Sequence, residues 1–175
     1  MKIIVAADGS GDYKTIGQAL LALENERETG KRSFIFVKKG VYREKLHIEK
    51  PNITLIGEDA ESTVITWDDY ARKLFDNGEE YGTFNSYTVL ITGDGFEARN
   101  ITFENSAGSG LIKGQALAAY VDADCAVFRN CRFKGHQDTL FTAPLPPKPV
   151  LKNGFKGPGE NRERKMQSHY YENCT

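Results

Sequence analysis

Four segments of the chain follow one template, in which an asparagine is followed by an apolar, a polar and a large apolar residue. They begin at Asn52, Asn100, Asn130 and Asn173, the last copy being only begun. Alternate residues of a strand point to the same side, so each copy presents its two apolar residues to a common interior. Repetition of one strand motif predicts an all-β solenoid, a right-handed parallel β-helix with each asparagine at an equivalent place on successive coils. A jelly roll or sandwich also uses short strands, but does not need an asparagine repeated in this way.

One amphipathic helix is expected before the strands, where it would cap the solenoid. Thr15 and Gln18 are spaced as a capping box, which satisfies free backbone donors at a helix start. Thr29 and Gly30 predict its end. Four apolar residues fall on one face of this helix at helical spacing: Ile16, Ala19, Leu20 and Leu23.

The chain is expected to form a single domain over residues 1–175, incomplete at its C-terminal end. Insertion loops at about 68–82 and 143–165 explain the irregular spacing of the repeats. Loops inserted on one face of a solenoid often line its binding side.

Composition excludes several classes of protein. The 175 residues carry 23 Lys and Arg against 24 Asp and Glu, a net charge of −1 that argues against nucleic-acid binding. No apolar run approaches the ~20 residues of a membrane span. The apolar N-terminal stretch ends at Asp8, too soon for a secretory signal, so the protein is either cytoplasmic or has a leader absent from this chain.

The three cysteines are predicted to be reduced thiols that pack as small hydrophobic residues. Cys125, Cys131 and Cys174 are an odd number for a disulfide framework. A zinc site with His136 has unusual ligand spacing and lacks an apparent fourth ligand. No metal is expected.

Two glutamines and one aspartate form the candidate site. Gln115 and Gln137 are 22 residues apart, about one coil, and stacked strands lie about 4.8 Å apart. Two side-chain amides at that spacing can donate to one oxygen, which would form an oxyanion hole for acyl transfer. The alternative is that each glutamine is an ordinary surface or ladder residue.

Asp138 is the candidate general acid. It would need to keep its proton near neutral pH, which desolvation by Phe133 or Phe141 would favour. Neighbouring strand residues point to opposite faces, so a bend at Gly135 is needed for Gln137 and Asp138 to reach one pocket. The alternative is a turn aspartate that bonds its own backbone.

Short motifs in a fixed order make nearly the whole chain resemble the pectinesterases (pectin methylesterases). They are 8–16, the Gly-x-Tyr-x-Glu segment 40–44, 82–84, 100–105 with 107–108, 114–116 and 135–140. The resemblance implies a parallel β-helix that hydrolyses methyl esters of homogalacturonan (pectin) and releases methanol, without a cofactor. It also implies a family that is usually secreted.

The resemblance also implies roles for single residues. Asp138 would be the general acid/base, Gln115 and Gln137 would stabilise the oxyanion, and Thr83 would contact substrate. The family's nucleophilic aspartate, in Asp-Phe-Ile-Phe-Gly, and the arginine of Leu-Gly-Arg-Pro-Trp have no counterpart here. We therefore expect a fragment of the enzyme that is inactive alone.

Two other functions stay open. One is that of a catalytically dead polysaccharide-binding β-helix, and the other is that of a fragment that needs a complementing chain. An unpaired last coil would favour self-association. His136 is expected to pack against neighbours. Five other acids are expected to have structural roles: Asp8, Asp12, Glu44, Asp122 and Asp124.

Overall fold

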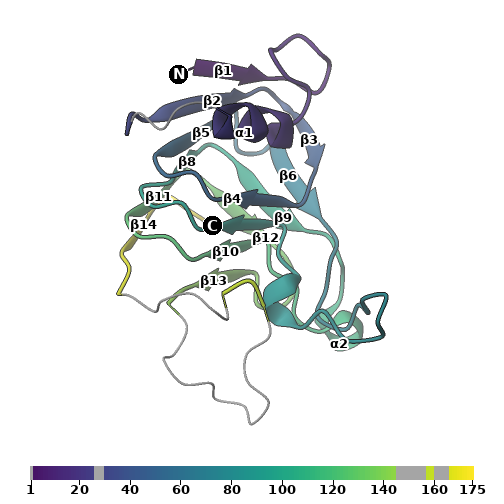
Figure 1. The fold of residues 1–175 in the computed structure, drawn as a ribbon. Coiled ribbons are helices and arrows are strands. Elements are labelled where there is room, and N and C mark those ends of the chain that lie inside the picture. The colour runs from purple at the N-terminus through teal and green to yellow at the C-terminus, as the bar shows by residue number, and fades with distance from the viewer. Residues whose placement is uncertain (1, 26–29, 145–156, 160–165) are drawn as a thin grey trace.

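The computed structural model describes residues 2–25, 30–144, 157–159 and 166–175. Strands stack in parallel into three sheets, as predicted for a parallel β-helix (Figure 1). Sheet A contains, in spatial order, β1 (Lys2–Val5), β2 (Ser33–Val37), β5 (Ile53–Gly57), β8 (Glu97–Arg99), β11 (Ala126–Arg129) and β14 (His169–Glu172). Sheet B contains β3 (Gly40–Arg43), β6 (Thr63–Trp67), β9 (Thr102–Asn105) and β12 (Arg132–Lys134). Sheet C contains β4 (Leu46–Ile48), β7 (Val89–Ile91), β10 (Ala119–Val121) and β13 (Leu140–Thr142).

Each coil passes from sheet A to sheet B to sheet C before the chain returns to sheet A. Strands β5, β6 and β7 form one such coil, and β8, β9 and β10 form the next. In-register parallel pairing stacks equivalent residues, as where Ala119 of β10 lies between Val89 of β7 and Leu140 of β13. The connections from sheet B to sheet C therefore stack along one side of the molecule.

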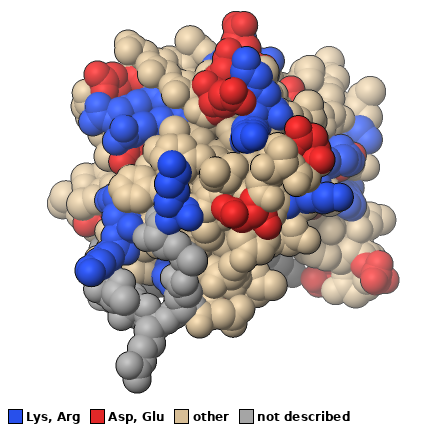
Figure 2. Space-filling model, turned by 90° about the horizontal axis from the view of Figure 1, so that it is seen from above, with Lys and Arg blue, Asp and Glu red and all other residues tan. Residues whose placement is uncertain are grey.

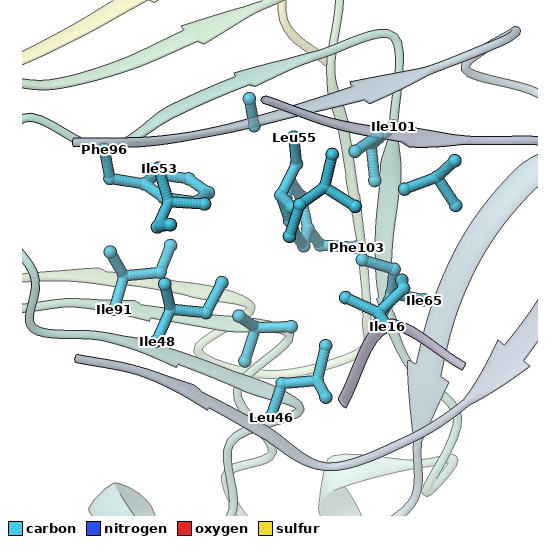
Figure 3. Packing of buried hydrophobic residues seen from close by; sticks show 14 of the residues in the cluster. Ile16, Leu46, Ile48, Ile53, Leu55, Ile65, Ile91, Phe96, Ile101 and Phe103 are labelled. Carbon is cyan, nitrogen blue, oxygen red and sulfur yellow. The ribbon is translucent and has the colours of Figure 1, made fainter. Parts of the chain in front are cut away.

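The core lies between the three sheets and is filled by aliphatic and aromatic side chains. Ile53 from sheet A faces Ile48 and Ile91 from sheet C (Figure 3). Ile101 and Phe103 are both fully buried, as the alternation after Asn100 predicts. Burying a side chain of this size contributes about 1.5–3 kcal/mol relative to exposure.

The predicted helix is α1 (Ile16–Glu24), which covers the N-terminal end of the stack. The Thr15 hydroxyl accepts from the Gln18 backbone N–H at 3.2 Å. This is the bond between the N-cap side chain and the helix backbone, one of the two bonds of the predicted capping box, and it is confirmed. The predicted inward face is confirmed too, since the buried residues of the helix are Ile16, Ala19, Leu20 and Leu23. The helix ends at Glu24, earlier than predicted, and Thr29 lies outside the described residues.

The asparagine repeat needs one correction. Asn100, Asn130 and Asn173 directly follow strands of sheet A, and the Asn130 amide donates to the Asn100 side chain at 3.2 Å. Asn52 instead precedes its strand in sheet A and lies beside Gly95 of the next coil. All four asparagines have φ between 51° and 58°. The turns before and after the strands of sheet A both need a residue with left-handed φ, a conformation that asparagine tolerates. The same sequence template therefore occurs at two different positions of the coil.

The cysteine prediction is confirmed for two of the three residues. Cys131 is fully buried in the core, and Cys174 packs against it. Cys125 is exposed, because it occupies a corner with φ of 55° rather than a strand. All three thiols are free.

Lysines, arginines and acids are interspersed on the face seen in Figure 2, in keeping with the small net charge. Within the described ranges, no helix is both long and apolar enough to cross a bilayer. Most of the expected insertion at 143–165 lies outside the described residues, and its boundaries stay a prediction.

Candidate active site

The two glutamines lie on neighbouring coils, in stacked connections from sheet B to sheet C. Gln115 is between β9 and β10, and Gln137 is between β12 and β13. The Ala116 backbone N–H donates to the Gln137 carbonyl at 3.0 Å, so the two segments lie side by side. The spacing of 22 residues therefore corresponds to one coil, as predicted. The catalytic roles of the side chains stay predictions.

Asp138 follows in the same connection, and the bend lies at this residue itself. Its φ is 55°, a left-handed value that breaks the alternation of a strand. Gly135 has a different function, because a Cβ there would lie 2.8 Å from the Thr139 hydroxyl oxygen. Asp138 is exposed in this structure, so the expected desolvation by Phe133 or Phe141 is wrong. His136 is exposed as well, which contradicts its predicted packing role.

The side chain of Gln137 lies against the connection that carries Gln115. A Cβ on Gly110 would come within 2.3 Å of Gln137 Oε1 and 2.8 Å of Gln137 Cβ. Gly110 begins the short helix α2 (Gly110–Lys113), which ends just before Gln115. Only a residue without a side chain at position 110 lets Gln137 approach this closely.

Thr83 belongs to a third connection of the same stack, on the preceding coil. It starts the 3₁₀ turn η1 (Thr83–Asn85), and its carbonyl accepts from the Ser86 hydroxyl at 2.5 Å. The Ser86 oxygen accepts in turn from the Leu117 N–H at 3.2 Å. Thr83 is thus linked through one side chain to the segment that follows Gln115.

Asn105 joins these connections, a role that the sequence reasoning missed. Its side chain is buried at the end of β9, and its Nδ2 donates to the carbonyls of Asp69 (2.9 Å), Ser86 (3.0 Å) and Leu117 (3.2 Å). Its Oδ1 accepts from the Ala107 N–H at 3.0 Å. The available signal was its place in the alternation, because Asn105 falls on the same side of the strand as the buried Ile101 and Phe103, and buried amides need partners.

An ion-pair network around the buried Asp69 carboxylate holds residues 68–82, the segment expected to be the first insertion. Lys45 Nζ donates to Asp69 Oδ2 and to the Asn85 carbonyl, both at 2.6 Å, and Lys73 Nζ donates to Asp69 Oδ1 at 2.5 Å. Burial alone would raise the pKa of Asp69, but the hydrogen bonds from both lysines outweigh it and hold the pKa below its usual value. Burial lowers the pKa of Lys45, although Asp69 opposes this change.

Aromatic rings line the outer side of sheet C next to Thr83. The ring centroids of Phe84 and Phe141 are 4.9 Å apart in an edge-on arrangement, and those of Phe84 and Tyr120 are 5.8 Å apart. Tyr120 is fully buried and Phe141 is partly exposed. An apolar surface of this kind beside two amides and a carboxyl group suits a ligand with both apolar and polar faces.

The other acids have structural roles, as predicted. The Glu44 carboxylate accepts from the Ile16 and Gly17 N–H groups, each at 2.8 Å, and so caps α1. Asp12 accepts from the Ile4 N–H at 2.7 Å. Asp124 accepts from the N–H groups of Cys125 and Ser168, while Asp122 accepts from the Gln167 amide. A hydrogen bond from Ser10 lowers the pKa of Asp8. Among the described residues, no group of three His, Cys, Asp or Glu side chains is placed to hold a metal ion.

Comparison with known proteins gives one consistent result. The family model described as Pectinesterase matches residues 2–145. The probable pectinesterase/pectinesterase inhibitor 36 of Arabidopsis thaliana is 43% identical over 145 residues, which are 81% of this chain and 26% of that protein. The solved pectin methylesterase from carrot is 41% identical, with a TM-score of 0.70 over 79% of this chain and 41% of the other. A pectin methylesterase solved in complex with a hexasaccharide is 31% identical, with a TM-score of 0.70 over 79% of this chain and 44% of the other. The chain thus spans less than half the length of these relatives.

Proposed function

Because the chain belongs to the pectinesterase family, we propose that its whole protein hydrolyses methyl esters of homogalacturonan and releases methanol. The observation that carries this proposal is the pairing of the Gln115 and Gln137 segments on neighbouring coils, with Asp138 next in the chain. The likeness to a pectin methylesterase that was solved with a hexasaccharide supports a polysaccharide substrate.

In the proposed reaction, a carboxylate attacks the ester carbonyl carbon and the C=O electron pair moves to oxygen. The amides of Gln115 and Gln137 donate to that oxyanion, where one donor typically lowers the barrier by about 3–4 kcal/mol. Asp138 gives its proton to the departing methanol and then takes a proton from the water that cleaves the acyl-enzyme. Thr83 contacts the bound polymer.

The nucleophile belongs, by resemblance, to a motif that residues 1–175 do not contain. One carboxyl group does not serve as both nucleophile and acid in one step, so we propose that these residues alone bind esterified pectin without turnover. The second candidate function is a polysaccharide-binding β-helix that performs no catalysis.

Binding and turnover are measured separately to test the proposal. We expect the chain to be retarded in gels that contain esterified pectin, and methanol release to stay at the blank value. Because the same amides would already donate to the ester carbonyl oxygen of the bound polymer, Gln115→Ala and Gln137→Ala should each weaken retardation, whereas Gln18→Ala on α1 should not. Absence of retardation would contradict the proposed substrate. Methanol release that survives Asp138→Asn would contradict the role given to Asp138.

Self-association through the last coil also stays a prediction. Among the described residues, strands β12, β13 and β14 form the edge of each sheet that lies farthest from β1. Light scattering would show an oligomer if these edges pair between copies, and a monodisperse monomer if they do not.

A further inference from the structure

Two aliphatic side chains next to the candidate site are almost fully exposed. Leu111 is 90% exposed and Ile112 is 71% exposed. Both belong to α2, which ends directly before Gly114 and Gln115. A single exposed leucine needs no explanation, but two adjacent ones at the edge of a candidate site indicate a contact with something outside the fold.

The backbone under these side chains is held firmly. Arg72 Nη1 donates to the Leu111 carbonyl at 3.0 Å and to the Ile112 carbonyl at 3.1 Å. The Lys113 ammonium lies 4.1 Å from the centroid of the Tyr70 ring. Both anchors come from the first insertion, which lies beside α2 (Figure 1). The helix is therefore presented as a fixed surface, and ordering it costs little on binding.

The first residue of α2 contacts the candidate site, and its last residue precedes Gln115 by two positions. Gly110, its first residue, lies against the side chain of Gln137. At its other end, the Gln115 carbonyl accepts from the Ala71 N–H at 2.8 Å, which ties the segment after α2 to the insertion. A polymer bound with one unit at the two glutamines would thus extend over or beside Leu111 and Ile112.

We propose that Leu111 and Ile112 form a specificity element for a methyl-esterified galacturonate unit, next to the unit held at Gln115 and Gln137. The inference rests on the proposed function and adds which neighbouring unit is preferred. An ester methyl group gains from contact with aliphatic side chains, whereas a free carboxylate would lose hydration there. Arg72 and Lys113 keep their positive charges beside α2, so any attraction to a free carboxylate is the same with and without the two aliphatic side chains and cancels when the variant is compared with the unaltered chain.

The test compares binding of two galacturonan oligomers of equal length, one fully methyl-esterified and one with free carboxylates. The chain is used as it is, and dissociation constants are measured by calorimetry. Burial of one methyl group corresponds to about a fourfold change in affinity. In the double variant Leu111→Ser and Ile112→Ser, affinity for the esterified oligomer should fall at least about fourfold. Affinity for the free-acid oligomer should not change.

The matched control is Leu21→Ser, because Leu21 is 59% exposed on α1 at the opposite end of the stack. It should leave both affinities unchanged. Thermal melting of both variants should match that of the unaltered chain, since surface changes of this kind typically stay within about ±0.5 kcal/mol.

The remaining outcomes separate the inference from the proposed function. If the unaltered chain binds neither oligomer, both fail. If the unaltered chain binds esterified pectin, the proposed function stands. The specificity element is then refuted if the double variant loses affinity equally for both oligomers, or if it loses affinity for neither of them. The double variant could instead lose a protein dimer in sedimentation while its affinity for both galacturonan oligomers stays unchanged. That result would identify a second copy of the chain as the partner of Leu111 and Ile112, and it would equally refute the specificity element.

Discussion

Replacing Asn105 with alanine is the most direct test of how the connections around the site are held. The variant removes two donated hydrogen bonds shared among three carbonyls, and one accepted from Ala107. Each bond contributes a net stability of about 1 kcal/mol, and buried groups left without partners add about 1–3 kcal/mol. The expected loss is therefore about 4–6 kcal/mol in the free energy of unfolding, a large share of the 5–15 kcal/mol typical of a domain.

Asn105→Asp provides a second variant of nearly the same size. The orientation of the Asn105 amide is fixed, because its oxygen accepts from Ala107 while its nitrogen faces three carbonyls. An aspartate would place an oxygen against those carbonyls, so it should destabilise the protein at least as much as alanine does. If lost volume alone mattered, Asn105→Asp would be nearly neutral.

Urea unfolding gives the required free energies, with an unchanged m-value as evidence that the same surface is exposed. Asn77→Ala is the control, because Asn77 is exposed and its side chain contacts only Glu79 nearby in sequence, through a long contact of 3.4 Å from Nδ2 and a hydrogen bond of 3.0 Å that Oδ1 accepts from the Glu79 N–H. It should change stability by no more than about 0.5 kcal/mol. A loss below about 1 kcal/mol for Asn105→Ala would show that the hydrogen bonds of one amide do not hold the two connections together.

Three further predictions concern charge and thiol chemistry. Glu44→Gln should lower the free energy of unfolding by about 1–2 kcal/mol in urea, because the first turn of α1 loses a capping carboxylate; no loss would contradict that role. Asp69 has a lowered pKa in the folded state, so its stabilising effect is present above about pH 4 and is lost as the pH falls through the folded value. In Asp69→Asn, stability measured across this range should fall less steeply, and an unchanged slope would contradict the lowered pKa. Burial raises the pKa of Cys131 to about 12, so native alkylation at pH 8 should label exposed Cys125 and spare Cys131, and equal labelling would show that the core opens.

Local patterns in the sequence predicted much of the fold. The apolar spacing after Thr15 gave the helix and its buried face, since helical periodicity depends only on nearby residues. The repeated asparagine template indicated stacked coils, yet it assigned Asn52 to the wrong corner. A preference for left-handed φ is a property of one residue and does not say which turn the residue occupies.

The candidate site was predicted in outline from the spacing of Gln115 and Gln137. The exposure of Asp138 was not predicted, because burial depends on what packs over a connection and not on its own sequence. The same reason explains why His136 proved to be exposed. Asn105 was recognised only as part of a motif, since its carbonyl partners come from two separate connections, one that contains Asp69 and Ser86 and one that contains Leu117.

The sequence by itself determined the solenoid, its capping helix and the family, because periodic burial and short motifs are written in consecutive residues. Only the tertiary structure decided how neighbouring connections meet: Gln137 over Gly110, Arg72 under α2, and Asn105 among three carbonyls. Those contacts join residues from different coils. Their geometry follows from the in-register stacking of parallel strands, which no single segment specifies.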